Sequence, residues 1–135
     1  MDLKTYVLNF DGSSKPNPGM MTSGYILRDG DTTVVSETIS GGEGTSNVAE
    51  YIGLYEGLKK ALELGCKHIK IIGDSEVVIK QILGPERGGY KCNKPRLQSY
   101  RDKVRILLGK FHTYEMIHVL RKNNKDADRL CRKAL

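Results

Sequence analysis

The 135-residue sequence lacks the features of several protein classes. No apolar run approaches the roughly 18 residues that a membrane span needs, so we expect no membrane association. The first ten residues, MDLKTYVLNF, lack the basic flank, apolar stretch and cleavage site of a signal peptide, and we expect a cytoplasmic protein. Internal repeats, low-complexity tracts and linkers are also absent. The length therefore predicts one domain over residues 1–135, with one sizeable core.

Cysteine is scarce and charge is biased toward the basic side. Cys66, Cys92 and Cys131 are odd in number, widely spaced and contain no CxxC pair. This pattern argues against a disulfide framework or a zinc site and favours reduced structural thiols, although a single disulfide in a thermophile stays open. The net charge of +6 favours polyanionic partners only weakly, because many basic proteins bind no nucleic acid.

Hydrophobic periodicity predicts strands at Thr5–Phe10, Met20–Arg28, Thr33–Ser40, His68–Ile72 and Thr113–Arg121, and helices at Asn47–Leu64, Ser75–Leu83, Arg96–Lys110 and Lys125–Ala134. An Asp-Gly pair predicts a hairpin between the second and third strands. The segments DGSSKPNPG and GGEGTS are rich in turn-forming residues and predict loops. The order β-β-β-α-β-α-α-β-α predicts an α/β fold with a mixed five-stranded sheet flanked by helices.

Acidic residues recur where strands end or helices begin, namely at Asp11, Glu50, Asp74, Asp126 and Asp128. Ligands usually bind at the sheet edge formed by the carboxyl ends of strands, so these side chains are expected to converge there. Converging carboxylates repel one another unless cations neutralise them. Oxygen ligands suit Mg²⁺ or Mn²⁺, and two such ions roughly 4 Å apart catalyse in-line attack on phosphodiesters.

Each of these acids also has a structural interpretation: a turn at Asp11, a capping box of Asn47 with Glu50, an N-cap at Asp74, and complementation of a helix dipole at Asp126 or Asp128. For Glu50 the neighbouring glycines favour function. Gly53 and Gly57 lie at i+3 and i+7 from Glu50, so a stripe of helix surface beside its carboxylate carries no side chains. This stripe permits close backbone packing or leaves room for a substrate.

Four segments, in order along nearly the whole chain, together carry a specific resemblance: FDGSSKPNPG (10–19), TSNVAEYIGLYEGL (45–58), IIGDSEVVIKQI (71–82) and LRKNNKDADRL (120–130). The sequence resembles the type 1 ribonuclease H family. The resemblance implies an endonuclease that uses two Mg²⁺ or Mn²⁺ ions to cut the RNA strand of RNA–DNA hybrids. From the two-metal chemistry we expect 5′-phosphate and 3′-hydroxyl product ends. We also expect a monomer, and double-stranded RNA as a secondary substrate because the contacts to the cut strand would be the same.

By position in the family's motifs, Asp11 would bridge both metal ions, and Glu50 and Asp74 would face the ion on the leaving-group side. Asp128 would hold the ion that activates water. Asp126 is the competing choice for this role. The two residues lie about 200° apart around a helix, so we do not expect both to face one site. The motif favours Asp128.

The resemblance also implies which residues contact the nucleic-acid substrate. Contacts to 2′-hydroxyl groups of the RNA strand are expected from Gly12, Ser13, Ser14, Ser46 and Asn47. Thr45 matches a position that contacts a DNA-strand phosphate, and Arg121 is a possible electrostatic helper. Helix capping is the alternative role for Thr45, Ser46 and Asn47, and many family members carry Asn where this sequence has Ser46.

Two departures from the family pattern concern binding and catalysis. The segment RGGYKCNKPRLQSYRDK is shorter than the basic, aromatic-containing protrusion of larger members and has no Trp, which predicts weaker binding. Only seven residues separate Leu120 from Asp128, too few for the flexible loop that carries a catalytic His in many members. We expect His118 to be packed and hydrogen-bonded inside a strand, and not to be the catalytic base. Five cations are expected to bind the phosphate backbone of the substrate and are called the phosphate track: Lys15, Lys91, Lys94, Arg96 and Arg121. The alternative is that they are only solvated surface residues.

Two other functions, and one other context for the chain, remain open from the sequence. A related nuclease that acts on DNA would have similar carboxylates, but the DGSSKPNPG and SNVAE segments favour a hybrid substrate. A non-catalytic nucleic-acid-binding module is disfavoured because all four expected carboxylates are present. The chain could also be a piece of a longer polyprotein such as a reverse transcriptase.

Overall fold

The structure, a computed structural model, describes residues 4–133, with side chains for residues 4–129. Its elements are β1 (Thr5–Lys15), β2 (Gly19–Asp29), β3 (Thr32–Gly44), α1 (Ser46–Glu63), β4 (His68–Gly73), α2 (Glu76–Leu83), η1 (Pro85–Arg87), α3 (Pro95–Leu108), β5 (Thr113–His118), η2 (Arg121–Asn123) and α4 (Lys125–Lys133). The predicted element order is confirmed, with η1 and η2 as added 3₁₀ turns. The expected end of the last helix, Ala134, lies outside the described residues. Within the described part of the chain, no helix is both long and apolar enough to cross a membrane.

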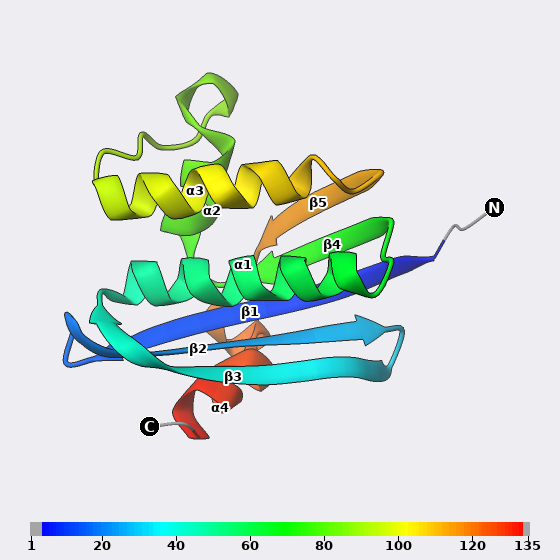
Figure 1. Cartoon of the computed structure of the whole chain (residues 1–135), viewed down its shortest axis with the longest axis horizontal. Coiled ribbons are helices and arrows are strands. Elements are labelled where there is room, and N and C mark those ends of the chain that lie inside the picture. The colour runs from blue at the N-terminus through cyan, green and yellow to red at the C-terminus, as the bar shows by residue number, and fades with distance from the viewer. Residues whose placement is uncertain (1–3, 134–135) are drawn as a thin grey trace.

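The strands form one mixed five-stranded sheet, as predicted, and their order in the sheet is β3-β2-β1-β4-β5. The hairpins β1–β2 and β2–β3 are antiparallel, whereas β4 runs parallel to both β1 and β5. Figure 1 shows α1 lying across one face of this sheet and α4 packed on the other. The strand β1 is therefore the central strand and is covered on both faces.

Two predicted loops are strand in the structure. β1 continues to Lys15 because Gly12–Lys15 pair with Met20–Ser23 of β2, which leaves a short turn between these strands. β3 continues to Gly44 through an irregularity in its register with β2. There Gly41 and Gly42 have positive φ angles of 123° and 78°, a backbone conformation that favours glycine. The glycine-rich sequence thus encodes a bulge in β3.

The last strand is shorter than predicted. β5 ends at His118, opposite Gly73 at the end of β4, and β4 is its only neighbour in the sheet. The chain beyond His118 keeps one sheet-like contact, in which the Val119 amide donates to the Gly73 carbonyl at 2.9 Å. It then turns through η2 into α4. Lack of a partner strand therefore ends β5 where the alternating sequence would permit it to continue.

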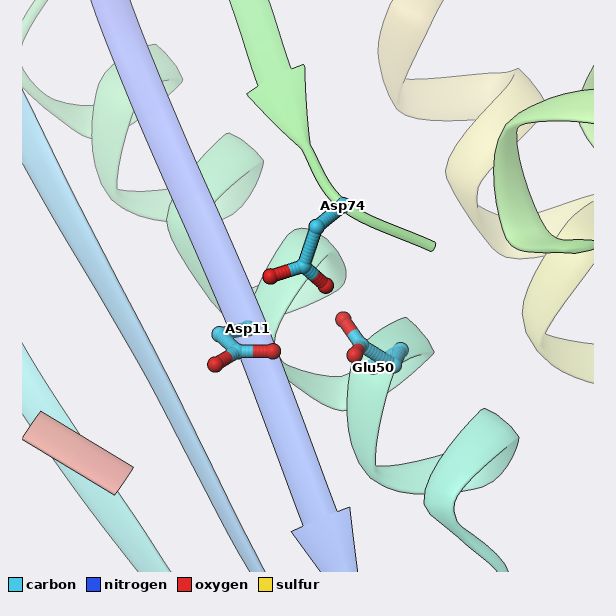
Figure 2. Close-up of side chains that lie close together, drawn as sticks. All are labelled: Asp11, Glu50 and Asp74. Atoms are coloured by element: carbon cyan, nitrogen blue, oxygen red, sulfur yellow. The ribbon is translucent and has the colours of Figure 1, made fainter. Parts of the chain in front are cut away.

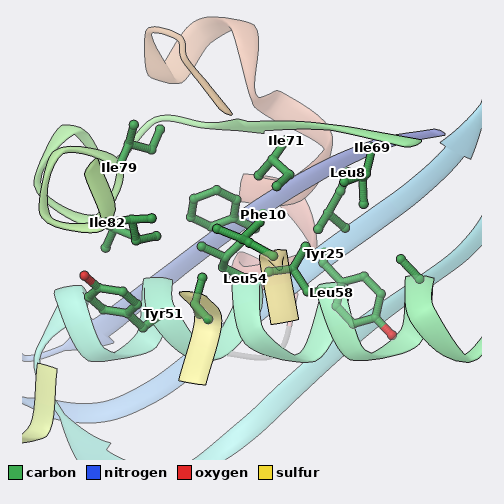
Figure 3. Packing of buried hydrophobic residues seen from close by; sticks show 14 of the residues in the cluster. Leu8, Phe10, Tyr25, Tyr51, Leu54, Leu58, Ile69, Ile71, Ile79 and Ile82 are labelled. Atoms are coloured by element: carbon green, nitrogen blue, oxygen red, sulfur yellow. The ribbon is translucent and has the colours of Figure 1, made fainter. Parts of the chain in front are cut away.

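The main core lies between α1 and the sheet. Leu8 and Phe10 of β1, Ile71 of β4, and Leu54 and Leu58 of α1 are fully buried there (Figure 3). Alternate residues of β4 are only half-buried, so one face of this strand is less covered than the other. Because side chains alternate along β1, the residues between Leu8, Phe10 and Gly12 point to the face covered by α4.

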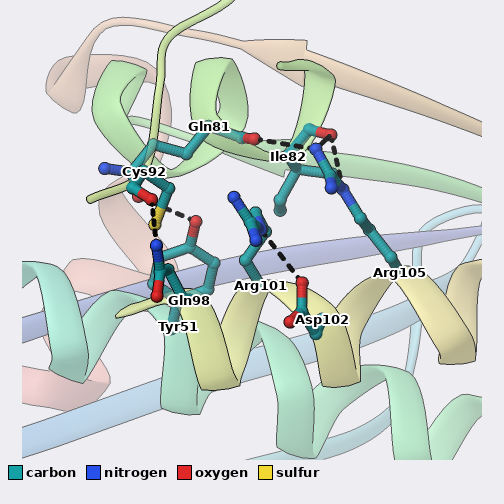
Figure 4. Close-up of polar contacts among 8 residues, drawn as sticks. All are labelled: Tyr51, Gln81, Ile82, Cys92, Gln98, Arg101, Asp102 and Arg105. Atoms are coloured by element: carbon teal, nitrogen blue, oxygen red, sulfur yellow. Dashed lines mark hydrogen bonds and ion pairs between the residues drawn. The ribbon is translucent and has the colours of Figure 1, made fainter. Parts of the chain in front are cut away.

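The helices beside the sheet are joined by polar contacts (Figure 4). The Arg105 guanidinium of α3 donates to the carbonyl oxygens of Gln81 and Ile82 near the end of α2. The Tyr51 hydroxyl of α1 donates to the Gln81 side-chain oxygen at 2.9 Å. These bonds fix α2, whose start follows Asp74.

The structure describes the side chains of two of the three cysteines. Cys66 and Cys92 are both buried, which suits the predicted structural role. The side chain of Cys131 lies outside the described residues.

Candidate active site

Asp11 lies inside β1, not directly after it as the sequence suggested. It pairs with Gly24 of β2, whereas β4 on the other side ends at Gly73, opposite Phe10. Beyond that point β1 has a neighbouring strand on one side only. The end of β4, not the end of β1, therefore opens the space in which the Asp11 carboxylate lies.

Asp74 follows β4 directly and does not cap the next helix. The N-cap of α2 is Ser75, whose hydroxyl accepts a hydrogen bond from the Val78 amide at 3.2 Å. The interpretation of Asp74 as a structural N-cap is therefore wrong. Its carboxylate instead points toward Asp11 and Glu50 (Figure 2).

Glu50 does not cap α1 either. The N-cap is Thr45, whose hydroxyl accepts from the Val48 amide at 3.3 Å, so the expected capping box of Asn47 with Glu50 is wrong. The backbone around Glu50 is pressed against the sheet. A Cβ on Gly12 would lie 2.2 Å from the Ala49 carbonyl carbon and 2.3 Å from the Glu50 nitrogen. Only glycine therefore permits this approach, which brings Glu50 to Asp11.

Two further contacts fix the distance between α1 and the sheet. The Ser23 hydroxyl of β2 donates to the Ala49 carbonyl at 2.6 Å. A Cβ on Gly53 would lie 2.7 Å from the Asp11 carbonyl oxygen and 2.9 Å from that of Gly24. The bare stripe beside Glu50 thus serves close backbone packing, and the alternative of room for a substrate is wrong for Gly53.

Asp11, Glu50 and Asp74 form a compact carboxylate cluster. One oxygen atom from each lies within 4.8 Å of those from the other two (Figure 2). Asp11 and Glu50 are only 3% and 6% exposed. Burial, with a smaller contribution from the Asp74 charge, raises the pKa of Asp11 to about 6. Burial and the Asp11 charge also raise the pKa of Glu50 well above its ordinary value, and burial raises the pKa of Asp74.

The cluster fits a hard cation better than it fits protons alone. One oxygen of Glu50, Oε2, is buried and has no hydrogen-bond partner among the residues that the structure describes. Leaving such a buried acceptor unsatisfied costs free energy, which a bound cation would recover. An all-oxygen set of crowded carboxylates is the ligand type that Mg²⁺ and Mn²⁺ prefer. The donor set therefore suits a divalent cation.

Asp128 and Asp126 point to different surroundings. The Asp128 carboxylate is close enough to raise the pKa of both Asp11 and Asp74. Asp126 instead forms an ion pair with Arg28 of β2. The structure thus brings Asp128, and not Asp126, to the other acids, in line with the motif. Its role as a metal ligand stays a prediction.

His118 is not packed as expected. It is exposed at the end of β5, opposite Gly73, and its charge lowers the pKa of Asp74. Arg121 has the same effect on Asp74 and is more strongly coupled to it. The expectation of a packed histidine is wrong because β5 ends at His118. The His118 side chain therefore lies at the edge of the sheet, beside the acids. Arg121 lies where an electrostatic helper is expected.

The residues expected to read 2′-hydroxyl groups lie mostly in regular structure. Gly12 is packed under α1, and the half-buried Ser13 hydroxyl lies 3.3 Å from that of Thr22. The buried Ser14 hydroxyl lies 2.8 Å from the Pro16 carbonyl oxygen and 2.7 Å from that of Gly44, and so joins the ends of β1 and β3. These residues are therefore strand, not loop, and their contact with a substrate stays a prediction.

The residues at the start of α1 remain accessible. Thr45, Ser46 and Asn47 are half-buried, and the Ser46 amide donates to the Asn17 side-chain oxygen at 3.1 Å. Thr45 has the capping role that was its alternative interpretation, which leaves its phosphate contact a prediction. The same holds for substrate contacts of Ser46 and Asn47.

The five cations of the expected phosphate track are all exposed. Arg96 also donates to the Glu43 carbonyl at 2.7 Å, which anchors the start of α3 to the end of β3. Exposure suits both a phosphate track and a solvated surface, so the track stays a prediction.

Sequence reasoning missed two buried amides next to the acids. Asn9 and Asn124 are 7% and 1% exposed and hydrogen-bond to each other at 2.9 Å. Asn124 stands directly before α4, where it resembles an ordinary helix cap. The one available signal was Asn9, a polar residue within an apolar strand.

Comparisons with known proteins identify the family. Residues 9–134 match the family model described as reverse transcriptase-like. The chain is 39% identical over 129 residues to ribonuclease HI of Halobacterium salinarum, a match that covers 93% of this chain and 62% of that protein. It is 34% identical over 131 residues to the bifunctional protein Rv2228c of Mycobacterium tuberculosis, covering 96% of this chain and 35% of that protein. The chain thus spans less than two thirds of these curated relatives.

Solved structures agree with these matches. The crystal structure of RNase H1 from Halobacterium salinarum has a TM-score of 0.89 at 35% identity, covering 96% of each chain. The N-terminal RNase H domain of Rv2228c, solved as a fusion with maltose-binding protein, has a TM-score of 0.89 at 32% identity, covering 97% of this chain and 93% of that one. LC11-RNase H1 in complex with an RNA/DNA hybrid has a TM-score of 0.83 at 26% identity, covering 95% of this chain and 94% of that one. The chain belongs to the type 1 ribonuclease H family.

Proposed function

We propose that this chain is an endoribonuclease that hydrolyses the RNA strand of RNA–DNA hybrids and leaves 5′-phosphate and 3′-hydroxyl ends. The observation that carries the proposal is the cluster of Asp11, Glu50 and Asp74, with its unpartnered buried Glu50 oxygen, on a ribonuclease H fold. The relative LC11-RNase H1, solved with an RNA/DNA hybrid, supports the choice of substrate. A monomer acting in the cytoplasm remains part of the prediction.

The acids present fit two divalent ions, Mg²⁺ or Mn²⁺. Asp11, Glu50, Asp74 and Asp128 are the residues that would hold them. When bound, such ions lower the pKa of water and stabilise negative charge on a phosphodiester. The chain's own contribution is to hold Asp11, Glu50 and Asp74 close together at the end of β4, in spite of their mutual repulsion.

Positive side chains complete the arrangement on the Asp74 side. Arg121 and His118 lie at the exposed edge of the site, and their charges lower the pKa of Asp74. They favour the ionised carboxylate that a cation needs, and they offer positive charge to an approaching phosphate backbone. We assign both an electrostatic role, because no hydrogen bond between described residues orients either side chain toward a fixed position.

The proposal is tested with end-labelled RNA–DNA hybrid, double-stranded RNA and double-stranded DNA of one sequence, each with Mg²⁺ and with excess EDTA. We expect cleavage of the RNA strand of the hybrid in Mg²⁺ only, with 3′-hydroxyl ends on the upstream products. Asp11→Asn, assayed in parallel, controls for contaminating nucleases. Robust cleavage in EDTA, or preferential cleavage of DNA, would contradict the proposal. Cleavage of double-stranded RNA at a lower rate would agree with the contacts expected to the cut strand.

A further inference from the structure

A pair of buried amides links three of the segments that carry the acids. Asn9 lies in β1, two residues before Asp11, on the sheet face covered by α4. Asn124 lies directly before α4, four residues before Asp128. Both side chains are almost fully buried, although they are 115 residues apart in the sequence. Burying polar amides is favourable only when their hydrogen bonds are made, so their partners define what the pair does.

Asn124 uses its side chain to join α4 to the other two segments. Its Nδ2 donates to the Phe10 carbonyl of β1 at 2.8 Å and lies 3.5 Å from Oδ2 of Asp74. Its backbone carbonyl accepts from the Asp128 amide at 3.2 Å, in the first turn of α4. One residue therefore contacts the strand of Asp11, the carboxylate of Asp74 and the helix turn of Asp128.

In the observed orientation of the Asn124 amide, both of its ends have hydrogen-bond partners. The Phe10 carbonyl and the Asp74 carboxylate both accept hydrogen bonds, so the Nδ2 group of Asn124 must face them. Its Oδ1 then faces the opposite way and accepts from Nδ2 of Asn9 at 2.9 Å. Without the Asn9 donor, Oδ1 would lose its buried partner, which would weaken the hold of the pair on Asn124.

Neutral amides suit this position better than charged groups. The charges of neighbouring acids already raise the pKa of Asp11 and Glu50. An acid at position 9 or 124 would add to that repulsion, whereas the Asn124 amide lowers the pKa of Asp74 by donating to it. The pair thus anchors the segments that carry the acids without adding net charge.

We propose that Asn9 and Asn124 form an amide clamp that positions Asp74 and Asp128 for cation binding. Neither is a catalytic residue, because both act through the carboxylates. The inference rests on the proposed function for its meaning, but cation binding tests it without any cleavage assay. Removing groups that orient metal ligands typically weakens metal affinity or activity by about 10- to 100-fold.

The decisive variants are Asn9→Leu, which removes the donor while roughly keeping the volume, and Asn124→Leu, which removes the clamp entirely. Asn123→Ala is the matched control, since it alters an exposed neighbouring asparagine. Mn²⁺ affinity is measured for each by calorimetry, together with kcat and KM for the hybrid and the unfolding temperature. We expect about 10-fold weaker Mn²⁺ binding for Asn9→Leu, a lower kcat, an unchanged KM, and wild-type values for Asn123→Ala.

Coupling to Asp128 separates positioning from general stability. If the clamp acts through the carboxylates, Asn9→Leu should weaken Mn²⁺ binding much less in an Asp128→Asn background than in the wild type. If Asn124→Leu fails to fold by circular dichroism, Asn9→Leu decides alone. Wild-type Mn²⁺ affinity in a folded Asn9→Leu protein, even with a lower unfolding temperature, would overturn the clamp. Weaker Mn²⁺ binding in that variant, combined with a wild-type protein that cuts no hybrid, would support the clamp and refute the proposed function.

Discussion

Asp11→Asn should abolish cleavage and at the same time stabilise the metal-free protein near neutral pH. Asp11 is almost fully buried beside Glu50, and its pKa is raised from 3.8 to about 6. The folded protein therefore binds this proton more tightly than the unfolded chain does. Its stability falls as the pH rises from 3.8 to about 6, and the whole cost is present above that window.

The size of the effect follows from the shift in pKa. A rise from 3.8 to about 6 corresponds to about 3 kcal/mol, at roughly 1.4 kcal/mol per pKa unit. We take this as an upper limit, because burying the asparagine amide also costs free energy unless both of its ends find hydrogen-bond partners. Asparagine keeps the acceptor for the Gly12 amide, now at 2.9 Å from Oδ1, and its own amide can donate to Glu50. We expect a net gain of about 1–3 kcal/mol at pH 8.

Urea unfolding of both proteins in EDTA, at pH 8 and at pH 4, measures the effect. The gain should be present at pH 8 and small at pH 4, where the wild-type carboxyl is also largely protonated. Added Mg²⁺ should stabilise the wild type more than the variant, since a bound ligand stabilises only the state that binds it. An Asp11→Asn protein that is less stable than wild type at pH 8, or that gains equally at both pH values, would refute the electrostatic reasoning.

Four other outcomes are expected. Cleavage should fall as the pH drops below about 6, because the cation needs ionised carboxylates and Asp11 binds a proton there; a flat pH–rate profile from pH 5 to 8 would speak against this. Asp128→Asn should reduce kcat much more than Asp126→Asn, which only breaks an exposed ion pair with Arg28, and the reverse order would exchange their roles. His118→Ala, if folded by circular dichroism, should lose less than the ~10²–10⁴-fold of a positioned general acid or base, and a thousandfold loss would assign proton transfer to His118. Hybrid affinity, measured by fluorescence anisotropy, should fall with rising salt through counterion release, whereas a flat response would remove the support for a phosphate track.

The sequence alone was sufficient for the fold class, the order of the elements and the identity of the acids. Periodicities of two and of about 3.6 residues are local properties, and they survive in the structure for every predicted strand and helix. The four family-like segments predict that Asp11, Glu50 and Asp74 share one site. The structure brings these three residues together.

Capping was beyond local reasoning. Asn47 and Asp74 are as suitable for caps as the residues that actually cap, Thr45 and Ser75. Which residue caps depends on where the helix begins, and packing of that helix against the sheet decides its first residue. Because α2 is capped one residue later, by Ser75, the Asp74 carboxylate is available to the cluster.

Strand pairing and burial were decided only by the tertiary structure. The glycine and serine residues after Asp11 have turn-forming composition, yet they are strand because β2 offers hydrogen bonds to them. His118 is exposed because β4, its only neighbouring strand, ends opposite it. The bond between Asn9 and Asn124 spans 115 residues, and no local pattern encodes such a contact. The sequence determines which groups are available, whereas long-range pairing determines which of them meet, because hydrogen bonds and burial depend on neighbours that lie far away along the chain.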